Sequence, residues 1–202
     1  MRPALLLVAA AAGSCASSVP PDRLYHFSTI PVPAAAERAP LSLEVRPFAL
    51  APHLQGDRLA ARISPVELEY YAGHRWAAPL EEILAEAVLQ GLREAGLFAA
   101  VVRSEDPGAR PDLTLSGYVR TCEEEDRFDG WWGVAVLEVA LRDAGSGRVL
   151  WSGEVRGERR AGGRHPARVV EALLGALGDA LGSIPWGKAA TAPASSPSVP
   201  ER

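Results

Sequence analysis

Two segments of the chain repeat their apolar residues with the period of an α-helix. In Pro79–Ala95 these residues share one stripe, Pro79 suits the first helical turn, and Gly96 suits the position after the last turn. A second stripe runs along Pro166–Ile184, where several glycines each weaken the helix by up to about 1 kcal/mol. The pattern therefore predicts two amphipathic helices, each with one buried face.

Other segments alternate apolar and polar residues with the period of two that is typical of half-buried strands. The alternation predicts strands at Leu41–Phe48, Arg58–Val66, Glu67–Tyr71, Phe98–Arg103, Asp112–Arg120, Val134–Arg142 and Arg148–Arg156. The second and third form a hairpin or a bent strand, and a glycine-rich turn joins the last two. The order β-β-β-α-β-β-β-β-α predicts an α+β fold, a mostly antiparallel sheet with two amphipathic helices packed on one face.

The first residues have the character of an export signal. A basic start, the apolar run Ala4–Ala12 and two small residues precede Cys15, which predicts a signal peptide over residues 1–14. Cys15 occupies the position of the lipidated cysteine in the lipobox of bacterial lipoproteins, although Ala12 stands where leucine is usual. A lipidated Cys15 would carry acyl chains such as palmitate, and Ala16 after it favours the outer membrane. The alternative is an ordinary signal peptide in which Cys15 has no special role.

Composition divides the remainder of the chain. We expect a tether over residues 15–23, one folded domain over residues 24–186 and a disordered tail over residues 187–202, because both flanks are rich in small residues and proline. The length of 202 residues suits one domain, and the net charge of −4 with a pI near 5.6 argues against nucleic acid as a partner. If Cys15 is acylated, Cys122 has no disulfide partner, so we interpret it as a buried apolar residue of a strand.

The sequence contains none of the common motifs of a catalytic, cofactor-binding or metal site. Its four histidines, His26, His53, His74 and His165, are scattered without the spacing of metal ligands. We therefore expect no enzyme activity, no cofactor and no metal. The acidic run 123–126 and the arginines within 156–164 are interpreted as solvated strand ends that pair across the sheet. A cation site and a patch for an anion or a lipid headgroup are the alternatives.

Aromatic residues gather in two places that are candidate surfaces for a partner. Tyr70, Tyr71 and Trp76 precede the first helix, and Trp131 and Trp132 lie in a turn flanked by glycines. If the Trp131–Trp132 segment is extended, the two side chains point to opposite faces of the sheet and one is exposed. If it is a turn, both can pack against the edge of the sheet. For Trp76, packing in the core at the start of the helix is the stronger interpretation.

Several of these segments together resemble the family of ABC-type transport auxiliary lipoproteins, which includes the paraquat-inducible protein C lipoproteins. The most specific stretch is Glu69-Tyr70-Tyr71 followed by His74-Arg75-Trp76-Ala77-Ala78-Pro79-Leu80. The resemblance extends over nearly the whole predicted domain through Leu24–Phe27, Leu43–Phe48, Leu92–Phe98, Asp112–Leu115 and Gly147–Trp151.

The resemblance implies a non-catalytic lipoprotein that faces the periplasm and works with an ABC transporter and an MCE-domain protein in lipid transport through the envelope. We expect this protein to dock through the two aromatic groups or through the uncovered face of the sheet. Assembly into a homo-oligomer is a further possibility. Two alternatives remain. One is a lipoprotein of the lipopolysaccharide-assembly type that partners an outer-membrane barrel, and the other is an envelope hydrolase with a dispersed active site.

Overall fold

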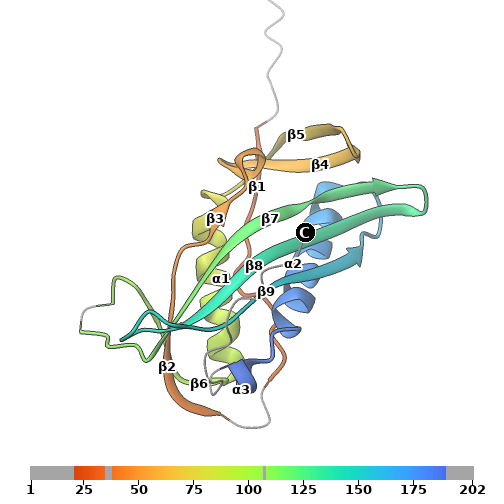
Figure 1. Cartoon of the computed structure of the whole chain (residues 1–202). Coiled ribbons are helices and arrows are strands. Elements are labelled where there is room, and N and C mark those ends of the chain that lie inside the picture. The colour runs from red at the N-terminus through yellow and green to blue at the C-terminus, as the bar shows by residue number, and fades with distance from the viewer. Residues whose placement is uncertain (1–20, 35–37, 107, 190–202) are drawn as a thin grey trace, which may run out of the picture.

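The computed structural model describes residues 21–34, 38–106 and 108–189 (Figure 1). The predicted signal peptide, Cys15 and the tail from residue 190 onward lie outside these residues. The strands are β1 (Arg23–Tyr25), β2 (Ala39–Val45), β3 (Ala49–Leu50), β4 (Arg58–Ser64), β5 (Glu67–Trp76), β6 (Phe98–Arg103), β7 (Leu113–Arg127), β8 (Gly130–Asp143) and β9 (Val149–Arg160). The helices are α1 (Leu80–Ala95), α2 (Pro166–Gly182), α3 (Trp186–Ala189) and the short 3-10 turn η1 (Pro52–Leu54).

The two long helices coincide with the predicted apolar stripes. Helix α1 follows Pro79 and stops at Gly96, whose φ of 65° is a left-handed conformation that glycine adopts readily. Helix α2 begins after His165, whose imidazole accepts a hydrogen bond from the Ala167 amide at 3.3 Å. Both helices lie on the same side of the sheet (Figure 1). We call the side that they cover the inner face and the opposite side the outer face.

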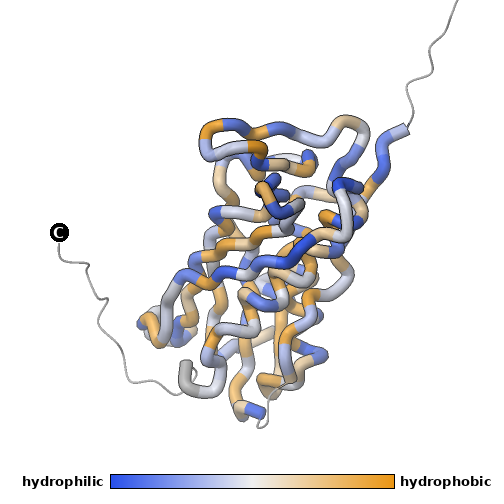
Figure 2. Tube along the Cα trace, turned by 90° about the vertical axis from the view of Figure 1, so that its right-hand side faces the viewer, coloured by the Kyte–Doolittle hydropathy of each residue, from blue (hydrophilic) through white to orange (hydrophobic). Residues whose placement is uncertain are grey.

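The sheet is mixed: antiparallel hairpins hold most of its paired residues, as expected, but several of its strand pairs are parallel, which the sequence did not predict. The hairpins β4–β5, β7–β8 and β8–β9 are antiparallel. Along its other edge, β7 pairs in parallel with β2, β3 and β4 in turn, while β2 is parallel to β6 and β1 to β5. Alternating hydrophobicity reports that one face of a strand is buried, but it carries no information about the direction of the neighbouring strand. Figure 2 shows how hydrophobic and hydrophilic residues are interspersed along the chain trace.

The hairpin formed by β7 and β8 is longer than the sequence predicted. Strand β7 continues to Arg127 through the acidic run, and β8 begins at Gly130, so the turn consists of Phe128 and Asp129. Trp131 and Trp132 therefore belong to a strand, which corrects their placement in a turn.

Close packing of α2 on the sheet depends on two glycines of the inner face. A Cβ atom added to Gly133 would lie 2.5 Å from the amide nitrogen of Leu173, and one added to Gly157 would lie 1.9 Å from the carbonyl oxygen of Ala176. Both facing atoms belong to the backbone of α2, so a side chain cannot be accommodated by a change of rotamer. Glycine at these positions sets the distance between the helix and the sheet.

The glycines within the helices serve a second close approach. A Cβ atom on Gly91 of α1 would lie 2.1 Å from the carbonyl oxygen of Ile30, and one on Gly178 of α2 would lie 2.7 Å from that of Pro31. The segment that contains Ile30 and Pro31 thus rests against both helices. The cost of glycine to the helix is offset by this packing.

The described chain ends in α3, so the first residues assigned to the disordered tail, 187–189, are helical. Trp186 packs edge-on against Phe98 of β6, with ring centres 6.0 Å apart, and its indole N–H donates to the Leu181 carbonyl at 3.1 Å. These contacts attach α3 to the end of the core.

Candidate functional site

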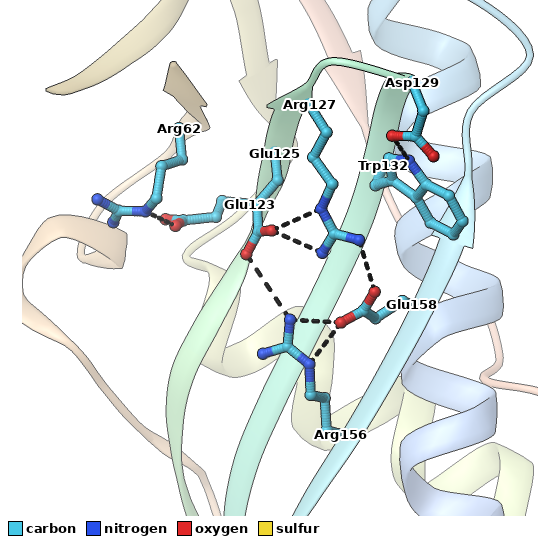
Figure 3. A network of polar contacts seen from close by, with 8 residues as sticks. All are labelled: Arg62, Glu123, Glu125, Arg127, Asp129, Trp132, Arg156 and Glu158. Carbon is cyan, nitrogen blue, oxygen red and sulfur yellow. Dashed lines mark hydrogen bonds and ion pairs between the residues drawn. The ribbon is translucent and has the colours of Figure 1, made fainter. Parts of the chain in front are cut away.

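The outer face of β7, β8 and β9 carries a network of alternating charges near the β7–β8 turn (Figure 3). Arg127 contacts Glu125 at 2.6 Å and Glu158 at 2.7 Å, while Arg156 contacts Glu158 and lies 3.9 Å from Glu125. Each carboxylate of this ring therefore lies between two guanidinium groups. The hydrogen bond from Arg127 lowers the pKa of Glu158, so the pair stays ionised near neutral pH.

This network confirms that part of the acidic run pairs with arginines across the sheet. It also covers apolar residues on the face opposite the helices. Val134 and Val136 of β8 are buried, and their cross-strand neighbours on β9 are Glu158 and Arg156. The aliphatic stems of such long charged side chains can shield apolar residues while their charged ends remain in water. The outer face is thus a packed polar layer.

Two adjacent glutamates of the acidic run are buried, on opposite faces of β7. Glu123 is 1% exposed and Glu124 is fully buried. On the outer face, Glu123 accepts a hydrogen bond from Arg62 of β4 and lies 2.9 Å from Nε2 of His53. The partners are separated from Glu123 by 61 and 70 residues in the chain. The expectation of solvated strand ends is therefore wrong for these two glutamates, because remote segments fold over them.

On the inner face, Glu124 is only partly compensated. One of its oxygens accepts a hydrogen bond from the Tyr71 hydroxyl. The other oxygen, Oε1, lies 3.9 Å from Arg164 Nε and has no hydrogen-bond partner among the described residues. Burial raises the pKa of Glu124, against the lowering effect of Tyr71 and Arg164. The fold therefore penalises the ionised carboxylate.

We expect Glu124→Gln to remove a pH-dependent loss of stability. A carboxyl whose pKa is raised by folding binds more protons in the folded state than in the unfolded state. The free energy of unfolding therefore falls as the pH rises above the ordinary pKa of 4.5 and through the folded pKa. The difference in this free energy, wild type minus Glu124→Gln, should decrease over that range and then level off.

Urea unfolding at a series of pH values measures this difference. The exposed Glu154 of β9 offers the matched control, Glu154→Gln, because it removes a carboxylate that water already solvates. If the free energies of unfolding of the wild type and of Glu124→Gln differ by the same amount at every pH, the burial of an ionisable group at this position is contradicted.

Tyr70 and Tyr71 lie on opposite faces of β5. The Tyr70 hydroxyl donates to the His53 carbonyl at 2.9 Å, and the guanidinium of Arg58 lies 3.7 Å from the centre of the Tyr70 ring. Tyr71 points to the inner face, where it meets Glu124. Both rings are half-buried and packed against the core. The two tyrosines thus hold the β4–β5 hairpin to the rest of the sheet.

The three candidate tryptophans differ in their surroundings. Trp76 is 3% exposed and belongs to the core, as its place before the first helix suggested. Trp131 faces inward and packs against the core. Trp132 lies on the outer face, where its indole N–H donates to Asp129 at 3.1 Å and Arg127 lies 5.0 Å from its ring (Figure 3). The two adjacent indoles point to opposite faces, as expected of an extended segment, and both are half-buried.

Sequence reasoning missed two exposed apolar residues at turns. Phe128, at the tip of the β7–β8 hairpin, is fully exposed, and Val66, at the tip of the β4–β5 hairpin, is 96% exposed. Phe128 stands within a polar stretch, 126–129, and Val66 lies between Pro65 and Glu67 in a turn. A large apolar residue inside a short polar turn is the signal that identifies such positions.

Within the described residues, no group of three or more His, Cys, Asp or Glu side chains is placed to hold a metal ion. None of the helices in that part of the chain has the length and hydropathy to cross a membrane. Cys122 is buried, and burial raises its pKa to about 12, so its thiol stays protonated near neutral pH.

The fold and these surfaces define an α+β domain with two long helices on one face of a mixed sheet. The family model described as the ABC-type transport auxiliary lipoprotein component matches residues 25–184, and the chain belongs to this family. The resemblance seen in the sequence is thereby confirmed. Membership makes the protein an auxiliary lipoprotein of the ABC-transport type, and thus an envelope protein anchored to a membrane.

Solved structures share this fold. The crystal structure of protein XCC0632 from Xanthomonas campestris superposes with a TM-score of 0.73 and 24% identity, covering 84% of this chain and 96% of that one. The crystal structure of an uncharacterized protein gives a TM-score of 0.59 and 19% identity, covering 77% of this chain and 90% of that one. At these identities the likeness shows the fold alone. No curated protein matches the chain.

Proposed function

We propose that this protein is a non-catalytic, periplasm-facing lipoprotein of the outer membrane and an accessory component of an MCE/ABC-type lipid transport system. The family match over residues 25–184 carries the proposal. In this role Cys15 bears the acyl chains that anchor the protein, and Ala16 favours its sorting to the outer membrane. The folded domain docks onto the periplasmic side of the system that the MCE-domain protein and the ABC transporter permease and ATPase form, without a cofactor or metal.

The docking surface in this proposal is the outer face around Trp132. Of the five aromatic candidates, Tyr70, Tyr71, Trp76 and Trp131 pack against or within the core. Trp132 instead lies over Arg127, at the edge of the charged ring. Tryptophan and arginine are the residues that most often dominate binding at protein interfaces. A partner would cover the indole with an apolar patch and present charges complementary to the ring.

Affinity capture tests the proposed function. The tagged full-length chain is purified from detergent-solubilised envelope beside its Cys15→Ala variant, and the co-purifying proteins are identified. We expect an MCE-domain protein and ABC transporter subunits with the wild type, and loss of the Cys15→Ala variant from the membrane fraction. An outer-membrane barrel as the partner would replace the proposal with the lipopolysaccharide-assembly role. Capture of neither, with Cys15 acylated, would contradict it.

We expect Trp132→Ala to reduce this capture by at least about tenfold, because truncating a central interface tryptophan typically costs about 2 kcal/mol or more. Trp132→Phe, which keeps an aromatic ring, should retain most of the binding. Thermal unfolding of both variants controls for folding. Capture by Trp132→Ala at the wild-type level would exclude the outer face near the turn as the docking surface.

A further inference from the structure

The tips of two hairpins lie together at one end of the sheet. Strands β4 and β7 are parallel neighbours, with Ala61 opposite Glu124 and Arg62 opposite Glu125. Because both strands then run in the same direction for a similar number of residues, the β4–β5 turn with Val66 and the β7–β8 turn with Phe128 reach the same end. Figure 1 shows both hairpins projecting to the same side of the molecule.

These tips carry two of the three large hydrophobic residues that are exposed in the described part of the chain. Its exposed large hydrophobic residues are Leu24, Val66 and Phe128. Val66 and Phe128 occupy the two tips, and Leu24 lies in β1, the strand that follows the predicted tether. Scattered exposed apolar residues need no explanation, but here two of them lie on adjacent projections and the third lies next to the anchored end.

We propose that the β4–β5 and β7–β8 tips contact the surface of the lipid bilayer in which the protein is anchored, with the side chains of Val66 and Phe128 inserted at the level of the headgroups. This inference rests on the lipid anchor of the proposed function. The two tips form a second, non-covalent attachment that fixes how the domain stands on the membrane.

The reach of the tether agrees with this arrangement. Asp22 is held by Arg75 at 2.6 Å, next to the pairing of Arg23 with His74. From His74 back to Glu67, at the tip, β5 covers about 23 Å at a rise of about 3.3 Å per residue. The chain from Cys15 to Asp22 can span up to about 25 Å. An acylated Cys15 can therefore lie in the same plane as the tips.

The shape and chemistry of the tips favour a lipid surface over a protein groove. Each tip presents one apolar side chain on a convex turn, which offers little of the roughly 800 Å² per partner of a standard protein interface. The exposed Glu67 and Asp129 beside the tips limit the insertion to the headgroup region.

This attachment leaves the outer face accessible. The charged ring lies on the face of the sheet rather than at its end, so it faces sideways, along the plane of the bilayer, when the tips touch the membrane. A periplasmic partner can then reach Trp132 from the side. The anchored tips and the docking surface thus have separate roles.

A fluorophore at single cysteines tests the proposal. Cys122 is buried, with its pKa raised to about 12, and Cys15 is acylated, so a maleimide dye reacts selectively at Phe128→Cys or Val66→Cys. Ser146→Cys, in the exposed β8–β9 turn at the opposite end of β8, is the matched control. The acylated full-length variants are reconstituted in vesicles of phosphatidylethanolamine and phosphatidylglycerol that contain brominated lipid.

We expect blue-shifted emission and several-fold stronger quenching by brominated lipid at positions 66 and 128 than at position 146. Equal, solvent-like emission at all three positions would overturn the proposal. So would a probe at position 128 that shifts only when a transport protein is added, since the tip would then bind protein.

A second tether separates this inference from the lipid anchor. The mature chain with hexahistidine in place of Cys15 is attached to vesicles that contain a nickel-chelating lipid, and the same dyes are read. If the acylated chain does not form but the tips are quenched on the chelating lipid, the anchor is contradicted and the tip contact stands. If the anchored chain floats with vesicles but the tips stay solvent-exposed, only the tip contact fails.

Discussion

Gly157→Ala should lower the free energy of unfolding by about 3 kcal/mol, near the upper end of the usual cost of overpacking. The added Cβ would lie 1.9 Å from the carbonyl oxygen of Ala176, 2.8 Å from its carbon and 2.9 Å from the amide nitrogen of Ala180. All three atoms belong to the backbone of α2, so no side chain can turn away. The helix must instead move off β9, which opens the tightly packed inner face.

Urea unfolding measures this loss, and Gly145→Ala is the matched control. Gly145 lies in the β8–β9 turn, where the nearest atom to an added Cβ is Asp143 Oδ1 at 3.7 Å. We expect Gly145→Ala to change the stability by less than about 0.5 kcal/mol. If the two variants unfold alike, α2 does not lie as close to β9 as described.

Glu123→Ala should cost about 3 kcal/mol, because it breaks a buried ion pair from one side. Glu123 is almost completely buried, and its carboxylate is the partner of Arg62 and of the His53 imidazole. Without it, the Arg62 guanidinium keeps its charge in a partly buried place and a cavity remains. Glu123→Gln should lose less, since the amide oxygen can still accept a hydrogen bond.

The control for Glu123→Ala is Glu154→Ala on the outer face of β9. Glu154 lies 3.2 Å from Arg120, but both side chains are about half exposed, and surface ion pairs contribute about 1 kcal/mol at most. Chemical denaturation measures the stability of both variants. It also measures the stability of a double variant, Glu123→Ala with Arg62→Met. The double variant should recover part of the loss. Equal stability of Glu123→Ala and Glu154→Ala would show that Glu123 is solvated.

Local regularities of the chain determined most elements of the fold, but not the short strands β1 and β3, helix α3 or the full length of the β7–β8 hairpin. The apolar stripe before Gly96 placed α1, because the side chains of a helix meet at fixed spacings along the same segment. The alternation and the turn residues between Val134 and Arg156 placed the hairpin of β8 and β9, because a hairpin also forms within one continuous segment of the chain. The opposite orientations of Trp131 and Trp132 also follow from the sequence, once the segment is known to be extended.

The pairing of the strands was decided by the tertiary structure. Nothing in the alternation of Leu41–Phe48 or Asp112–Arg120 states that β2 lies parallel to β7, because a strand buries the same face beside a neighbour of either direction. The acidic run shows the same limit. Its charges read as solvated ends, yet Glu123 and Glu124 are buried.

The sequence separation between interacting residues explains why some features could be predicted from the sequence and others could not. Helical stripes and turns depend on residues within a few positions of one another, so the sequence by itself determined them and the family resemblance that they carry. The export signal is a local pattern of the same kind and stays a prediction. The burial of Glu123 beneath Arg62, and the placement of Val66 and Phe128 at the same end of the sheet, involve segments about 60 residues apart. Only the folded chain brings such residues together, and it alone decided where the surfaces of this protein lie.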